Sequence, residues 1–414
     1  MTAATNALTT FAAATAPTAI TPADAAPATE AARADQRLAR RYFFDDTNMD
    51  LFFLAAIGWG VNGGLSFGEA LHVKSTIVDG DAVSWVRSFA DHGALQGIAA
   101  DDWLARGCLR EAGEARLKSF AAYRSAWQFA VPGAEFDALY ASHRQAFGQA
   151  LRELSIRHEF FAAPYAGRTL PGVYLPNEDA DAPVVLIIGG ADTCFEDLFL
   201  GYGRDLVSRG YSVAIADLPG QGRCQAEGLY WETEAEKPIA AIVDVLAGRF
   251  AARRGRIALL GLSLGGYFVT RAAGHEPRLA TVIASTPFPN PAELFAKSVH
   301  GNRASTTMSS ATLRSFRMSF WKAGASNPQE FLANTAHMTA DPALVTLPFL
   351  SILGTGDSAV FAAQARQWHR DIASADKKLV VLDAATGADG HCQVANRRRL
   401  VQECAAWLKE IFAR

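Results

Sequence analysis

Six short apolar runs, separated by helical stretches, constrain the fold of this 414-residue chain more than any other feature. The runs are Pro183-Val-Val-Leu-Ile-Ile, Tyr211-Ser-Val-Ala-Ile-Ala, Arg256-Ile-Ala-Leu-Leu, Leu279-Ala-Thr-Val-Ile-Ala, Pro348-Phe-Leu-Ser-Ile-Leu and Lys378-Leu-Val-Val-Leu. Strands that are apolar without alternation are buried on both faces, which predicts a parallel sheet covered by helices. The spacing between the runs fits βαβ crossovers.

Two further strands precede these six. Glu159-Phe-Phe-Ala-Ala-Pro-Tyr and Arg168-Thr-Leu-Pro-Gly-Val-Tyr-Leu flank a Gly turn and predict an antiparallel opening pair. The fold class is therefore α/β, with a mostly parallel sheet of eight strands. Residues 289–345 are too long for an ordinary crossover and predict a helical lid inserted after the sixth strand.

The chain before the sheet has a different pattern. Residues 36–157 carry apolar side chains at helical spacing, as in Glu135-Phe-Asp-Ala-Leu-Tyr-Ala-Ser-His-Arg-Gln-Ala-Phe, and predict a helical accessory domain. Residues 158–414 then form the catalytic domain. Residues 1–35 are mostly Ala, Thr and Pro and are expected to be disordered.

The third apolar run leads directly into Gly-Leu-Ser263-Leu-Gly-Gly and an apolar helix. A serine on a tight strand-to-helix turn has its hydroxyl exposed at the carboxyl edge of the sheet, and this geometry needs glycines at positions 261 and 265. The motif predicts Ser263 as the nucleophile of an α/β-hydrolase fold. The amide of Leu264, at the helix N-terminus, is then an oxyanion donor.

In this fold the acid and the base follow the serine, each after a strand. His391 follows the last strand, whereas the other eight histidines lie before the sheet, in helices or in the insertion. Asp357 ends Gly-Thr-Gly-Asp after the preceding strand and is the predicted acid, with Asp383 and Asp389 as alternatives. Ala191, in the Gly-Gly-Ala loop after the first parallel strand, is the predicted second oxyanion donor.

These motifs, together with Gly-His391-Cys-Gln-Val-Ala-Asn and the helical N-terminal block, resemble the FrsA-like α/β-hydrolases. The resemblance covers most of residues 40–412. It implies serine-hydrolase chemistry on carbon–carbon bonds next to a carbonyl, on aromatic polyketides of secondary metabolism, or on esters and amides. It also implies a substrate pocket between the helical domain and the hydrolase domain.

The resemblance suggests Glu293 as an auxiliary carboxylate, although a helix cap on the surface is the favoured role for it. The accessory region is rich in aromatic residues at helical spacing, which favours a core role over a pocket lining. They are Phe43, Phe44, Phe52, Phe53, Trp59, Phe67 and Trp85.

The composition narrows the partners. The net charge of −3 gives no reason to expect nucleic acid or an anionic membrane surface. Five cysteines without close pairing or metal-ligand spacing indicate reduced thiols, and the N-terminus lacks a secretory pattern, so a cytoplasmic location is expected. We expect no metal and no organic cofactor. The expected partner is a small-molecule substrate, and a homodimer is left open.

The predicted reaction is attack of Ser263 on the activated carbonyl of a small or medium aromatic or polyketide-like ketone or ester. The alternatives are an acyltransferase or cyclase that uses the same acyl-enzyme, and a general carboxylesterase or amidase. All of them depend on the same oxyanion chemistry, so the residues alone do not separate them.

Overall fold

The structure is a computed structural model that describes residues 37–303 and 308–413. The segment 1–35, which the sequence predicts to be disordered, lies outside the described residues. No helix among the described residues combines the length and the apolar character needed to cross a membrane.

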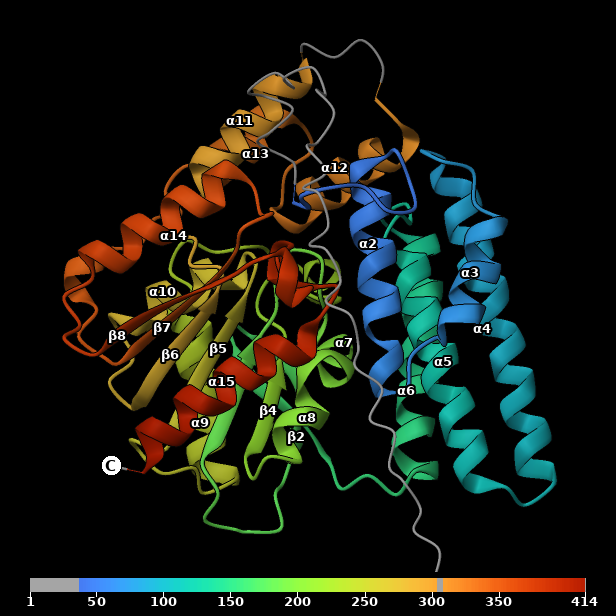
Figure 1. The fold of residues 1–414 in the computed structure, drawn as a ribbon, viewed down its shortest axis with the longest axis horizontal. Helices are drawn as coiled ribbons and strands as arrows, with labels where there is room; N and C mark the ends of the chain where they lie inside the picture. The colour runs from blue at the N-terminus through green and yellow to red at the C-terminus, as the bar shows by residue number, and fades with distance from the viewer. Residues whose placement is uncertain (1–36, 304–307, 414) are drawn as a thin grey trace, which may run out of the picture.

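The centre of the molecule is an eight-stranded sheet in the order β1-β2-β4-β3-β5-β6-β7-β8 (Figure 1). The strands are β1 (Glu159–Tyr165), β2 (Arg168–Leu175), β3 (Val184–Ile188), β4 (Ser212–Ala216), β5 (Ile257–Leu262), β6 (Leu279–Ser285), β7 (Phe349–Gly354) and β8 (Lys377–Leu382). β1 and β2 are antiparallel to each other, β2 is antiparallel to β4, and the remaining neighbours are parallel. This confirms the predicted fold class and every predicted strand.

Both faces of the sheet are buried along β3 to β7, which explains why these strands read as continuous apolar runs. The prediction of burial on both faces is wrong for β8, which lies at the edge of the sheet and is partly exposed. Along β3, Val185 and Ile187 belong to one hydrophobic core, while Leu186 and Ile188 belong to the core on the opposite face. The carboxyl ends of the parallel strands meet at one edge, the upper edge in Figure 1. Residues that follow these strands are therefore brought together there.

Two sets of helices cover the faces. α7 (Phe195–Leu198), α8 (Arg204–Val207) and α15 (Arg397–Phe412) cover one face, and α9 (Glu236–Arg249), α10 (Gly265–Ala273) and α14 (Ala359–Asp371) cover the other (Figure 1). This is the covered parallel sheet that the sequence predicts.

The N-terminal part is all helical and packs beside the sheet (Figure 1). Its helices are α2 (Thr47–Gly58), α3 (Phe67–Ser75), α4 (Ala82–Ala105), α5 (Leu109–Trp127) and α6 (Ala134–Glu153). Their apolar faces share one continuous hydrophobic core with a face of the sheet, in which Phe53 and Trp85 are fully buried. The helical part is thus joined to the sheet by buried apolar surface, which stabilises both.

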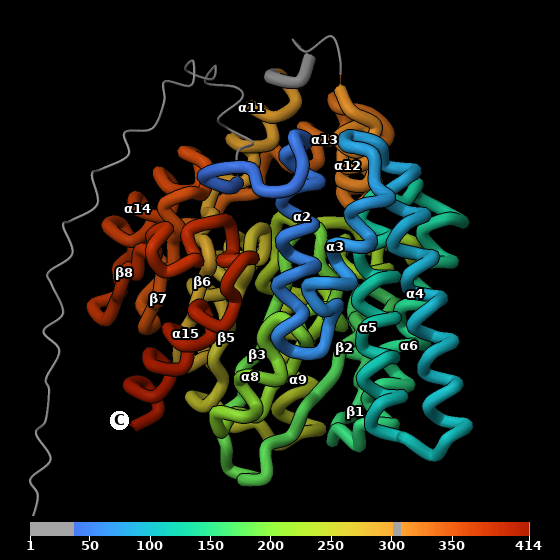
Figure 2. The backbone as a smooth tube through the Cα atoms, turned by 45° about the vertical axis from the view of Figure 1, so that its right-hand side comes forward, coloured from blue at the N-terminus to red at the C-terminus, as the bar shows by residue number. Residues whose placement is uncertain are grey.

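Three helices are inserted between β6 and β7, as the sequence predicts: α11 (Pro291–Arg303), α12 (Ser310–Lys322) and α13 (Pro328–Thr335). They lie over the carboxyl edge of the sheet, and α12 lies at the upper end of α2 in both views (Figures 1 and 2). Hydrogen bonds fasten the two parts together, since Ser310 Oγ donates to the Gly80 carbonyl (3.0 Å) and Asn48 Nδ2 donates to Thr312 Oγ1 (3.2 Å).

Candidate active site

Ser263 sits on the turn between β5 and α10 with φ of +57°, a conformation that non-glycine residues rarely adopt. The flanking glycines are needed because backbone lies where a Cβ would be. A Cβ on Gly261 would lie 2.3 Å from the Gly265 carbonyl oxygen, and one on Gly265 would lie 2.5 Å from the Gly189 carbonyl oxygen. The predicted reason for both glycines is therefore confirmed.

The imidazole of His391 lies between the serine and the predicted acid. His391 Nε2 is 2.8 Å from Ser263 Oγ, and His391 Nδ1 is 2.8 Å from Asp357 Oδ2. The three residues follow three different parallel strands, and the carboxyl edge of the sheet brings them together. Both distances are those of hydrogen bonds in a nucleophile–base–acid relay.

The carboxylate of Asp357 is held on both oxygens. Its Oδ1 accepts the Ser358 amide (2.8 Å), and its Oδ2 accepts Thr286 Oγ1 (3.3 Å) in addition to the imidazole. The alternative acids lie elsewhere: Asp383 Oδ1 accepts the Thr386 amide (3.2 Å) and caps a turn, and the Asp389 carbonyl accepts the Gly356 amide (2.8 Å). Among the described residues, the hydrogen bonds of the His391 ring nitrogens go to Ser263 and Asp357.

The loop that carries His391 is fixed on several sides. Its amide donates to the Arg37 carbonyl (2.9 Å), and its ring packs against Phe361 at 4.6 Å between centroids. Gln393 Oε1 accepts from Ser285 Oγ (2.7 Å) at the end of β6. Burial lowers the pKa of His391, but the Asp357 carboxylate outweighs burial, so the pKa lies above its ordinary value.

The predicted oxyanion donors border the serine. Gly190 approaches so closely that a Cβ there would lie 2.6 Å from Ser263 Cβ, which places the following residue, Ala191, at the nucleophile. Ala191 and Leu264 both line a cavity with Ser263. Within the described part of the chain, the amides of Ala191 and Leu264 donate no recorded hydrogen bond to the protein, so both are available for a developing oxyanion.

Residues 189–192 form the oxyanion loop, and three side chains that the sequence analysis missed donate hydrogen bonds to its carbonyls. Gln221 Nε2 donates to the Gly189 carbonyl (2.6 Å) and the Gly190 carbonyl (3.0 Å). Lys322 Nζ, at the end of α12, donates to the Ala191 carbonyl (2.5 Å), and Arg124, from α5, donates to the Asp192 carbonyl. The Asp217-Leu-Pro-Gly-Gln221 turn, which follows β4, thus supports the site.

Two adjoining cavities open at Ser263 and His391, of about 730 and 1130 Å³. The smaller lies between the N-terminal helices and the sheet, where the resemblance implied a pocket, and Phe52, Trp59 and Trp85 line it. The larger lies under the inserted helices. The core role favoured for the aromatic residues holds for most of them: Phe44, Phe53, Trp59 and Trp85 belong to the hydrophobic core, and Phe43 and Phe52 pack against it. Phe52, Trp59 and Trp85 also border the cavity, and Phe67 is exposed.

Glu293 is not brought to this site. It lies in the first turn of α11, where its Oε1 pairs with Lys297 Nζ (2.9 Å) and its Oε2 accepts from Gln364 Nε2 (3.0 Å). It lines neither cavity that contains Ser263. The surface role is the one that its contacts fit.

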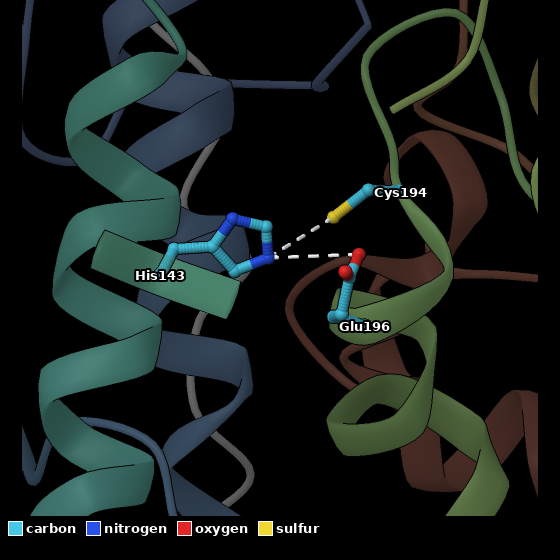
Figure 3. A group of neighbouring side chains, drawn as sticks. All are labelled: His143, Cys194 and Glu196. Atoms are coloured by element: carbon cyan, nitrogen blue, oxygen red, sulfur yellow. Dashed lines mark hydrogen bonds and ion pairs between the residues drawn. The ribbon is translucent and has the colours of Figure 1, made fainter. Parts of the chain in front are cut away.

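A second group of polar side chains connects α6 with the start of α7 (Figure 3). His143 Nε2, on α6, points at Cys194 Sγ (3.7 Å) and Glu196 Oε2 (3.6 Å), and all three side chains are buried. Their atoms lie within 4.8 Å of one another and could ligate a metal ion, although their sequence spacing gave no metal signal.

The surroundings of this group favour a polar junction. Glu196 Oε1 is already paired with Arg144 Nε (3.1 Å). Burial, and then the carboxylates of Asp197 and Glu196, raise the pKa of the Cys194 thiol well above its ordinary value, so the thiol stays protonated. As a protonated thiol, Cys194 can hydrogen-bond to the imidazole of His143.

Comparison with known proteins agrees with this geometry. Residues 204–414, which include Ser263, Asp357 and His391, match the prolyl oligopeptidase family. The chain belongs to this family. It is therefore a hydrolase with the α/β-hydrolase fold, and the serine at the strand-to-helix turn makes it a serine hydrolase.

Similar curated proteins come from fungi. Hydrolase acrC of Aspergillus aculeatus is 28% identical over 256 residues, which cover 56% of this chain and 60% of that protein. The 20-hydroxy-prefusarin hydrolase of Gibberella moniliformis is 30% identical over 247 residues, which cover 56% of this chain and 58% of that protein. The chain thus spans less than two thirds of the length of these relatives.

Solved structures extend the likeness in fold to the helical part. The 2,6-dihydroxy-pseudo-oxynicotine hydrolase has a TM-score of 0.68 at 21% identity, over 86% of this chain and 95% of that one. AbyA5 has a TM-score of 0.62 at 18% identity, over 84% of this chain and 90% of that one. The coverage means that the N-terminal helices and the sheet are arranged alike in these proteins.

Proposed function

We propose that this protein hydrolyses an activated carbonyl, a carbon–carbon bond or an ester, in a small or medium aromatic or polyketide-like substrate. The observation that carries the proposal is the Ser263–His391–Asp357 relay, with hydrogen bonds of 2.8 Å at both ends of the imidazole, at the mouth of two cavities. A relay of this kind converts a weak hydroxyl nucleophile into one that attacks carbonyl carbon at neutral pH.

The steps follow from the positions of the groups. His391 Nε2 accepts the proton of Ser263 Oγ as the oxygen attacks the carbonyl carbon. The amides of Leu264 and Ala191 stabilise the resulting oxyanion, while Asp357 stabilises the imidazolium. The leaving group takes the proton from His391, and water, activated by the same imidazole, then releases the acid from the acyl-enzyme.

The shape and polarity of the smaller cavity support the substrate class. Phe52, Trp59 and Trp85 border this cavity, and their apolar side chains suit an aromatic or conjugated body. The name of the 20-hydroxy-prefusarin hydrolase, a relative, also points to a small organic substrate.

The test is covalent labelling of the nucleophile. Wild-type protein is expected to react with a fluorophosphonate probe and to turn over p-nitrophenyl butyrate. Ser263→Ala is expected to lose both activities while keeping the wild-type melting temperature, because the change removes one oxygen atom at a half-buried position.

Ser142→Ala is the matched control, since this half-buried serine of α6 donates to the Ala138 carbonyl of its own helix (3.0 Å). It should label and turn over like the wild type. Persistent labelling of a folded Ser263→Ala protein would overturn the proposal.

A further inference from the structure

Arg37 occupies the junction of the two cavities. Six residues border both cavities, and Arg37 is the one arginine or lysine among them; the six are Arg37, Phe52, Ala191, Asp192, Ser263 and His391. The backbone at Arg37 is tied to the relay, because its carbonyl accepts the amide of His391 (2.9 Å).

The guanidinium of Arg37 is held in place by neutral groups. Its Nη2 donates to Asn48 Oδ1 (2.7 Å), and its centre lies 5.4 Å from the centroid of the Phe52 ring. Among the ion pairs of the described residues, Arg37 takes part in none. A guanidinium has five N–H donors, so most of those of Arg37 remain available for a ligand.

The charges around the smaller cavity do not cancel. Three guanidinium groups (Arg37, Arg124 and Arg397) line it against two carboxylates (Asp192 and Asp197). Arg124 is paired with Asp197, and Arg397 donates to the Ala55 carbonyl (2.9 Å). Asp192 borders the same junction as Arg37. The guanidinium groups outnumber the carboxylates by one positive charge, which favours binding of a single anionic oxygen where Arg37 can donate a hydrogen bond to it.

The two bond types under the proposed function differ in what leaves the tetrahedral intermediate. An ester expels an alkoxide or phenoxide, which His391 can protonate directly. A 1,3-diketone expels a carbon fragment, and its electron pair must be carried on the second carbonyl oxygen as an enolate. A fixed cation beside that oxygen stabilises the charge as it develops.

We propose that Arg37 binds the enolate oxygen of a 1,3-dicarbonyl substrate and thereby directs this hydrolase to carbon–carbon bonds. The inference rests on the proposed function and deepens it by naming the substrate class. The aryl or conjugated body lies against Trp59 and Trp85, and the second carbonyl faces Arg37.

The step balances without any further reactant. Ser263 Oγ forms a bond to the attacked carbonyl carbon and loses its proton to His391. The bond from that carbon to the central carbon of the diketone breaks, and its electrons pass to the enolate oxygen at Arg37. The imidazolium returns the proton to the central carbon, which gives a ketone, and water hydrolyses the acyl-enzyme to a carboxylic acid.

The experiment compares two substrate types on the full chain. Benzoylacetone, dibenzoylmethane and 1-(2-hydroxyphenyl)-1,3-butanedione are followed by loss of enol absorbance, and p-nitrophenyl butyrate serves as the ester. Arg37→Met is expected to lower the ratio of diketone to ester kcat/KM by about tenfold to a hundredfold, mainly through the diketone kcat. Arg37→Lys, which keeps the charge, should recover part of the ratio.

Arg41→Met is the matched control, because Arg41 is an exposed arginine four residues away whose ion-pair partner among the described residues is Asp45 at 3.9 Å. It should leave the ratio unchanged. A wild type that cleaves none of the three diketones, or an Arg37→Met ratio within twofold of the wild type, overturns the assignment of Arg37. A wild-type protein that does not react with the fluorophosphonate probe would instead overturn the proposed function itself.

Discussion

Lys322 gives the sharpest test of how the oxyanion loop is held. Its side chain is 1% exposed, and its ammonium donates to the carbonyl of Ala191, the residue whose amide we propose as an oxyanion donor. Met has nearly the same length and volume without the charge or the donors. Lys322→Met therefore removes the tether and leaves the packing of α12 largely intact.

The expected loss of activity can be worked out from the donor that the tether positions. Removing one oxyanion donor costs about 2.7–4 kcal/mol of transition-state stabilisation. If a loosened loop forfeits half of that, kcat falls by about tenfold to thirtyfold. Stability should change little, within about 2 kcal/mol, because the lost hydrogen bond is offset by no longer burying an ammonium group.

The assay is kcat and KM for p-nitrophenyl butyrate, with the melting temperature measured on the same samples. Lys297→Met is the matched control, since Lys297 is an exposed lysine of the same insertion whose recorded partner is Glu293. It should retain wild-type kcat. A folded Lys322→Met protein with kcat within twofold of the wild type would refute the view that this lysine positions the oxyanion donor.

Two further substitutions test the relay and the turn. Asp357→Asn should lower kcat by about 10⁴-fold. The Asp357 carboxylate raises the pKa of His391, and activity needs the neutral imidazole, so the rise of the residual kcat/KM with pH should move to lower pH. An inflection at the same or a higher pH would contradict this. Gly265→Ala should lower the urea midpoint of unfolding or prevent folding, because the added Cβ would lie 2.5 Å from the Gly189 carbonyl oxygen. Gly68→Ala is the control, since a Cβ there meets nothing within 4 Å. Equal urea midpoints for the two variants would contradict the steric argument.

The parts of the fold that could be predicted are those whose signal is local. The parallel strands β3 to β7 are buried on both faces, so β3 and β5 read as unbroken apolar runs wherever they lie in the chain. The turn at Ser263 is equally local, since its glycines respond to backbone only a few residues away or on the next strand. Chain order then assigned Asp357 and His391, which the sheet edge brings together.

The residues that sequence reasoning missed act across long separations. Lys322 meets Ala191 over 131 positions and Arg124 meets Asp192 over 68, and neither pairing leaves a periodic trace in the sequence. A lysine at the end of an amphipathic helix reads as a surface residue, because burial of a charge depends on what packs over it. Glu293 is the opposite case. The family resemblance suggested it as a site residue, whereas its contacts with Lys297 and Gln364 place it on the surface.

The three supports of the oxyanion loop come from three separate parts of the chain, and this bears on why the hydrolase carries its accessory helices. Gln221 belongs to the sheet domain, Arg124 to the N-terminal helices and Lys322 to the insertion. Two of the three supports are buried cations, which bind a carbonyl strongly only where water is excluded. The helices therefore do more than wall the cavities: by packing on the sheet they dehydrate and fix the loop that must stabilise the oxyanion, so that the geometry of the reaction depends on the closed arrangement of all three parts.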